Sequence, residues 1–197
     1  MITWNRFGHS NRIAKAYQKA GLPVLVAENA AWGNEFLGGK WNSIARNFHN
    51  TAGCFDYHGP ERWDGLGFDL APFRTSGETV ILPQRGIGSQ PTAMPKAWAV
   101  YARQKYKARV RKHPGKNPGI PLESDLARCH RVITWGSGAA IKALMMGIHV
   151  VSEMPNWIGE QDNTEQGRLD MFRRLAWAQW TLDEIASGLP FERLIHR

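Results

Sequence analysis

The sequence predicts an α/β protein in which parallel strands alternate with helices, and three observations support this class. Short strands such as "VLVA" and "TVIL" alternate along the chain with segments of helical character. These strands are continuous apolar runs, as is typical of strands buried on both faces of a parallel sheet. Turns rich in glycine and proline separate the elements. Such a sheet is covered by helices on both sides and binds ligands beyond the carboxyl ends of its strands.

The first residues predict a β-α-β unit. A weak strand and a "GHSN" turn precede a helix expected from about Arg12 to Ala20, which Ser10 or Asn11 can cap. A buried strand follows from Pro23 to Ala27. Residues 30–75 are rich in glycine, asparagine and aromatic side chains, and they predict only loops with short elements.

Regular alternation returns after this segment. We expect strands at 79–82, 108–114, 130–135 and 149–153, with helices between them. The closing segment "TEQGRLDMFRRLAWAQWTLDEIASG" has helical spacing and predicts one long helix, or two with a break near Thr181. The loops expected to share one edge of the sheet follow Ala27, Leu82, Arg111, Trp135 and Val151.

A change of composition around "PFRTSGE" predicts the division of the chain. Residues 1–75 are expected to form one Rossmann-like half, and residues 76–197 another, each with a parallel sheet. The 197 residues suffice for one sizeable domain or for two small ones.

The composition narrows the function classes. No apolar run approaches the roughly 20 residues of a membrane-spanning helix, and the N-terminus lacks a secretory signal, so we expect a soluble cytoplasmic protein without a membrane partner. Cys54 and Cys129 are far apart and show no metal-ligand spacing, so no metal site is expected. The formal net charge of +8 favours an anionic partner such as a nucleotide or a nucleic acid. A basic surface without a specific partner is the alternative.

The stretch "HRVITWGSGAAIKALMMGIHVV" predicts an anion-binding loop. Gly136, Ser137 and Gly138 connect a strand to a helix, where unpaired amides and the positive end of the helix dipole favour an anion. Lys142 lies about one turn further on and can add a charge. The alternative is a close helix-strand contact in which Ser137 is an ordinary cap. The common G-x-x-x-x-G-K-S/T and G-x-G-x-x-G motifs are absent.

A second candidate is the histidine of "VRKHPGK". His113 ends a predicted strand and precedes Pro114, so its ring is expected to leave the sheet edge and donate to a phosphate or a leaving oxygen. A structural turn histidine is the alternative.

These two stretches carry a resemblance to a known family. "RVRKHPG" followed by "DLARCHRVITWGSGAAIKALMMGIHVV" resembles the carboxyl-terminal half of GT-B glycosyltransferases, particularly bacterial sialyltransferases, polysialyltransferases and Kdo-transferases. In those families a His-Pro motif and a downstream serine motif hold a nucleotide-sugar donor. The matching positions are His113 with Pro114, Ser137, and 147–151. This chain departs from the pattern at Lys142, where many members have a glutamate that binds ribose, and at His149, where proline is usual.

The resemblance implies roles for further residues. The loop "PQRGIG", with Gln84, Arg85 and Gly86, would contact the diphosphate or the sugar of the donor, although a plain glycine turn explains it as well. The amino-terminal half would supply the acceptor contacts and the base. Glu28 or His9 would deprotonate an acceptor hydroxyl, although a cap or a loop salt bridge explains Glu28 equally well.

Three further residues are expected at the acceptor. Ser10 and Asn29 would be neighbours of the base, and Trp32 would stack on the acceptor, with loop anchoring as the alternative for this tryptophan.

The expected function is therefore that of a metal-independent glycosyltransferase whose nucleotide-sugar donor is a substrate rather than a cofactor. The basic charge makes DNA with a hydroxymethylated base a plausible acceptor, as for bacteriophage enzymes that act in the host cytoplasm. One rival is a noncatalytic nucleic-acid-binding protein on a degenerate GT-B scaffold, which Lys142 supports. Another is an enzyme that processes phosphate esters or nucleotides.

Overall fold

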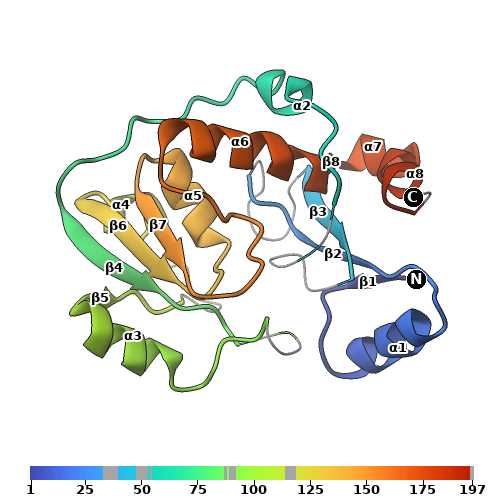
Figure 1. The fold of residues 1–197 in the computed structure, drawn as a ribbon, viewed down its shortest axis with the longest axis horizontal. Helices are drawn as coiled ribbons and strands as arrows, with labels where there is room; N and C mark the ends of the chain where they lie inside the picture. The colour runs from blue at the N-terminus through green and yellow to red at the C-terminus, as the bar shows by residue number, and fades with distance from the viewer. Residues whose placement is uncertain are drawn as a thin grey trace.

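Two four-stranded sheets form the centre of the molecule, with helices around them (Figure 1). The structure is a computed structural model that describes residues 1–32, 40–47, 53, 55–86, 88, 92–113 and 119–195. Sheet A has the strand order β1-β2-β3-β8, and sheet B has the order β5-β4-β6-β7. The predicted α/β class is confirmed.

Sheet B is parallel throughout, as predicted. Its strands are β4 (Glu78–Leu82), β5 (Arg109–Val110), β6 (Cys129–Thr134) and β7 (His149–Ser152). The helices between them are α3 (Trp98–Tyr106), α4 (Leu122–Asp125) and α5 (Ala139–Met145). Val80 and Val132 in its two central strands are fully buried, as continuous apolar strands should be. The loops after these four strands therefore share one edge.

Sheet A differs from the prediction. β1 (Ile2–Trp4) runs parallel to β2 (Leu25–Asn29), but β3 (Trp41–Arg46) runs antiparallel to β2 and to β8 (Gln179–Thr181). The expectation of a parallel sheet in the first half is wrong, because residues 30–40 are too few for the crossover of about a dozen or more residues that a parallel neighbour needs. The loop after Ala27 consequently belongs to sheet A and not to the edge of sheet B.

The remaining helices are α1 (Gly8–Lys19), α2 (Glu61–Asp64), α6 (Glu165–Leu175), α7 (Leu182–Ala186) and α8 (Leu189–Ile195). α1 begins four residues before the predicted Arg12, because Ser10 bonds back to the N–H of Phe7 and so starts the helix earlier.

The closing segment contains a strand that was predicted as helix. α6 ends at Leu175, a 3₁₀ turn covers 176–178, and β8 then joins sheet A. Thr181 starts α7 with a capping box, in which its hydroxyl accepts from the N–H of Glu184 at 3.2 Å and the carboxylate of Glu184 accepts from the N–H of Thr181 at 2.8 Å. The break is therefore longer than expected and includes a strand.

Two apolar clusters tie the sheets to the C-terminal elements. The larger one lies between sheet B, α5 and α6, where the rings of Trp63 and Phe172 stack with centroids 4.6 Å apart. The smaller one combines sheet A with the C-terminal segment, and its buried members are Leu25, Ile44, Trp177, Trp180 and Leu194. The division at residues 75 and 76 stays a prediction. In the part of the chain that is described, no helix has the length and apolar character needed to span a bilayer.

Candidate functional site

The strand order of sheet B defines one position for a ligand. β4 and β6 are neighbours, while the chain proceeds from β4 outward to β5 on one side and from β6 outward to β7 on the other. In open α/β sheets, the crevice beyond the carboxyl ends of two such strands is the usual binding position. The segments that leave these two strands are 83–86 and 135–138, which contain most of the predicted donor-binding residues.

Gln84 holds the two segments together. Its side-chain amide donates to the carbonyl oxygen of Trp135 at 2.6 Å and to that of Thr92 at 3.2 Å. The indole N–H of Trp135 donates to the same carbonyl of Thr92 at 3.2 Å. The amide group of Gln84 is therefore engaged in fixing the start of the serine loop, and its predicted role as a direct donor contact stays a prediction.

The two glycines beside Ser137 differ in what surrounds them. Gly136 has a φ of +83°, which favours glycine, and a Cβ atom there would lie 2.7 Å from the sulfur of Met154, so any side chain would displace this methionine. Gly138 has a φ of −60°, which any residue adopts, and a Cβ atom there would meet no atom within 4 Å. Packing thus explains the first glycine, whereas the backbone at the second is open to solvent.

Most of the amides at the serine loop are already paired. The N–H of Ser137 donates to the hydroxyl oxygen of Thr134 at 2.9 Å, and the Ser137 hydroxyl accepts from the N–H of Ala139 at 3.3 Å. Ala140 donates to the carbonyl of Ser137 at 3.0 Å. Of the backbone N–H groups from Ser137 to Ala140, only that of Gly138 has no hydrogen-bond acceptor among the described residues. Ser137 does act as a local cap, and the set of free amides predicted from the sequence reduces to one exposed position.

Positive charge gathers along the same edge. Arg85 follows β4 and is exposed, while Arg111 and His113 follow β5. Partial burial of the ring, and then the charges of Arg85 and Arg111, lower the pKa of His113 from its ordinary value. Arg111 is paired with Asp125 at 2.6 Å, so Arg85 is the less engaged of the two guanidinium groups.

The other predicted donor residues are placed less fully. Gly86 has a φ of +68° in the loop after β4, which fits a glycine turn. Lys142 is half-buried on α5 and forms no ion pair within the described residues. Pro114 lies outside the described residues.

Glu153, directly after β7, is a structural residue. Its carboxylate accepts from the indole N–H of Trp98 at 2.7 Å, the hydroxyl of Tyr106 at 2.6 Å and the amine of Lys105 at 2.7 Å. Burial raises the pKa of Glu153, but hydrogen bonds from Lys105, Tyr106 and Trp98 outweigh burial and hold it below its ordinary value. A carboxylate so engaged is a poor base, and it anchors α3 to the end of β7.

The predicted base and acceptor residues Glu28, Asn29, His9 and Ser10 lie in sheet A and α1, which Figure 1 places beside sheet B and not within it. Trp32 follows β2 and packs in the apolar cluster that borders sheet B. Glu28 is half-buried within β2, opposite Ser43, and Asn29 ends the same strand. His9 is exposed on α1 and its ring contacts the guanidinium of Arg12 at 2.8 Å. The structure thus brings the predicted donor residues to one edge of sheet B. The predicted residues Glu28, Asn29 and His9 lie on other elements.

Ser10 and Trp32 have structural roles. The hydroxyl of Ser10 donates to the carbonyl of Phe7 at 2.8 Å in the cap of α1. Trp32 is only 2% exposed and packs against Trp63 with ring centroids 5.2 Å apart. The apolar core covers the ring of Trp32, as the alternative of loop anchoring expects, and stacking on an acceptor stays a prediction.

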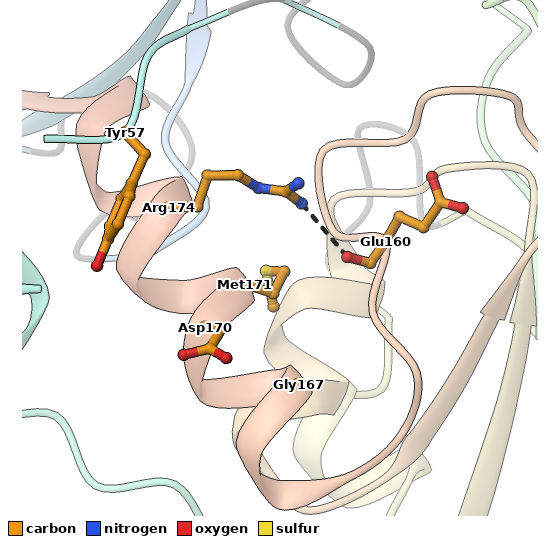
Figure 2. A pocket seen from close by; sticks show the side chains of 6 residues that line it. All are labelled: Tyr57, Glu160, Gly167, Asp170, Met171 and Arg174. Atoms are coloured by element: carbon orange, nitrogen blue, oxygen red, sulfur yellow. Dashed lines mark hydrogen bonds between the residues drawn. The ribbon is translucent and has the colours of Figure 1, made fainter. Parts of the chain in front are cut away.

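Two cavities lie outside the predicted site. One has a volume of about 300 Å³ and lies between α6 and the loop after β7. The guanidinium of Arg174 donates there to the backbone carbonyl of Glu160 at 3.3 Å, and Figure 2 draws this contact as a dashed line. Its lining is Tyr57, Glu160, Gly167, Asp170, Met171 and Arg174. A second, of about 200 Å³, lies along β7 and shares Glu160. Sequence reasoning missed both, and the one available signal was the placement of Asp170 and Arg174 one turn apart on α6.

Among the residues that the structure describes, no cluster of three or more histidine, cysteine, aspartate or glutamate side chains is arranged to hold a metal ion. No model of a known protein family matches this chain, and no curated protein matches it either.

Proposed function

We propose that the protein is a glycosyltransferase and that the carboxyl edge of sheet B binds the phosphate of its nucleotide-sugar donor. The observation that carries this proposal is the exposed backbone at Gly138, which lies at the switch between β4 and β6 and which neither packing nor conformation explains. The resemblance of the His113 and Ser137 motifs to GT-B donor sites supports the finer assignment to sugar transfer.

The charges along the edge suit the leaving group. In the proposed reaction an acceptor hydroxyl oxygen attacks the anomeric carbon, the bond from that carbon to the phosphate oxygen breaks, and the electron pair stays with the phosphate. Arg85, protonated His113 and Lys142 would stabilise the negative charge that develops there. The base that receives the hydroxyl proton is expected in sheet A or α1, where Glu28 and His9 stay the candidates.

The experiment is a thermal-shift panel with UDP-, GDP-, CMP- and ADP-sugars on the wild-type protein and on Gly138→Val. We expect at least one donor to raise the Tm of the wild type and to leave Gly138→Val unchanged, because the added side chain fills the space above the loop. The absence of any shift in the wild type, or an equal shift in both proteins, would contradict the donor site.

The second candidate is a noncatalytic nucleic-acid-binding protein. Lys142, which stands where a ribose-binding glutamate is usual and has no ion-pair partner within the described residues, favours it. The two candidates give different results in the same assay. Stabilisation by DNA alone, unaffected by His113→Ala, would favour the binding protein, whereas stabilisation by a nucleotide sugar that His113→Ala removes would favour the transferase.

A further inference from the structure

The first 27 residues carry only positive charge. Their basic side chains are Arg6, Arg12, Lys15 and Lys19, and the first acidic residue of the chain is Glu28. Arg6 is buried and holds α1 in place, because its guanidinium donates to the side chains of Asn11 at 2.9 Å and Gln18 at 2.5 Å. The other three cations are exposed. These three cations therefore face solvent, and residues 1–27 contain no acidic side chain that could neutralise them.

α1 exposes more of its surface than a covering helix normally does. Ala14 is its one fully buried residue. At 3.6 residues per turn, Arg12, Lys15 and Lys19 fall on one stripe of the helix, and Ile13 and Tyr17 fall on another. A helix of a globular protein usually turns its apolar stripe to the core, yet Ile13 and Tyr17 are 39% and 38% exposed. The basic stripe faces solvent, and the body covers the apolar stripe only in part.

β1 adds aromatic surface next to this helix. It is the edge strand of sheet A, and Ile2 and Trp4 alternate with Thr3 and so share one face of the strand. Trp4 is 55% exposed, and Phe7, in the turn that leads into α1, is 60% exposed. Figure 1 shows β1 and α1 together at the end of the molecule that lies away from α3. Exposed rings and exposed cations on the same β1–α1 unit are the two features that an anionic partner with stacking groups can use.

We propose that this β1–α1 face, defined by Trp4, Phe7, Arg12 and Lys15, binds single-stranded nucleic acid. Aromatic rings stack on unpaired bases irrespective of sequence, while lysine and arginine follow the phosphate backbone. The exposed cations Arg12, Lys15 and Lys19 are complementary in charge to the phosphates of the strand. A lipid surface fits less well, because an interfacial helix inserts a broad face of large apolar side chains, whereas α1 offers only Ile13 and Tyr17. The proposal does not depend on the donor site, which lies at sheet B.

The test is fluorescence anisotropy with a labelled oligothymidylate of about 20 nucleotides, longer than one typical binding site, titrated at several salt concentrations. We expect Trp4→Ala and Phe7→Ala each to weaken binding roughly tenfold, as the loss of one stacked base does. Lys15→Gln should weaken binding and lower the slope of log K against log salt by about 0.7, the value for one phosphate contact on a single strand. Tm measurements verify that these variants at exposed positions stay folded.

Matched variants on α3 provide the control. Tyr101→Ala removes a ring that is 52% exposed, and Lys96→Gln removes an exposed cation in the segment before that helix, so neither should change the affinity. Equal losses from the α3 variants would overturn the proposal, as would duplex DNA that binds as tightly as the single strand. A second assay compares the wild type and Trp4→Ala on vesicles of phosphatidylcholine and phosphatidylglycerol. Cosedimentation that Trp4→Ala removes, together with no binding to the oligonucleotide, would overturn the proposal in favour of a membrane surface.

Trp4→Ala should leave the thermal shift produced by nucleotide sugars intact. This result distinguishes a loss of nucleic-acid binding from a failure of the donor site.

Discussion

Gly136 and Gly138 illustrate at the residue scale how a sequence motif combines two physical causes. The turn needs Gly136, because its φ is +83° and because Met154 and Trp157 pack where a side chain would lie. Gly138 has helical dihedral angles and open space around it. A glycine that neither conformation nor packing requires is a better indicator of a bound ligand than one that the fold itself explains.

This difference predicts opposite effects of the same substitution. Gly136→Ala should destabilise the protein by about 1–3 kcal/mol, through strain at positive φ and overpacking against Met154. Gly138→Ala should leave the free energy of unfolding unchanged or raise it by up to about 1 kcal/mol, because alanine restricts the unfolded chain, and it should weaken nucleotide-sugar binding. Urea unfolding and a donor titration measure the two quantities. If Gly138→Ala binds donor as the wild type does, the open backbone is not a binding surface.

His113 predicts a pH dependence of ligand binding. Its pKa in the free protein is lowered by partial burial and by the charges of Arg85 and Arg111, which favours the neutral ring. A bound phosphate places negative charge beside the ring and raises the pKa, so binding takes up a proton and affinity increases as the pH falls from the raised pKa of the complex towards the lowered pKa of the free protein. Calorimetry in two buffers with different ionisation enthalpies measures the proton uptake. His113→Asn should abolish it, and uptake that persists in this variant would assign the proton to another group.

At the scale of elements, the strands of sheet B were predictable and those of sheet A were only partly so. Continuous apolar runs such as "TVIL" mark strands that are buried on both faces. β3, with the sequence "WNSIAR", has polar residues at Asn42 and Ser43 and follows a glycine-rich stretch, so its pattern resembles a loop. β8 lies in a segment whose apolar residues continue the helical spacing of α6. The capping box from Thr181 to Glu184 was the available sign that a new helix starts there.

Glu153 predicts how α3 is attached to sheet B. Glu153→Ala should destabilise the protein by about 2 kcal/mol, because the donor groups of Trp98, Lys105 and Tyr106 lose a charged acceptor. The folded state lowers the pKa of Glu153, so this stabilisation is present above about pH 4.5 and is lost as the pH falls through the lowered value.

The measurement is the difference in the free energy of unfolding between wild type and Glu153→Ala at neutral pH and at acid pH. Glu123→Gln, at an exposed position on α4, is the control and should change the stability little at either pH. A difference for Glu153→Ala that does not shrink in acid would show that packing, and not the charge, attaches α3.

For the whole molecule, the position of the predicted donor residues could be derived from the sequence because parallel strands bring their carboxyl ends to one edge. His113, Arg85 and Ser137 follow three strands of the same sheet, and this rule alone puts them together. The same rule does not apply to Glu28, because β2 belongs to a mixed sheet whose last strand comes from the other end of the chain. Trp32 could not be placed either, since its burial depends on Trp63 and Phe172, which are distant in sequence.

Because β8 comes from the C-terminal part of the chain and completes sheet A, we expect the stability of the predicted half 1–75 to depend on residues outside it. β3 pairs with β8, and Arg62 in α2 donates to the carbonyl of Gln179 at 2.6 Å and lies 4.3 Å from the ring centroid of Trp180. A fragment of residues 1–75 would expose Leu25 and Ile44 and should show no cooperative unfolding by circular dichroism. In the full chain, Trp180→Ala should cost about 3–5 kcal/mol, whereas Tyr101→Ala, at an exposed ring, should cost little. A fragment 1–75 with a sharp unfolding transition would show instead that the first half is an autonomous domain that the C-terminal segment merely covers.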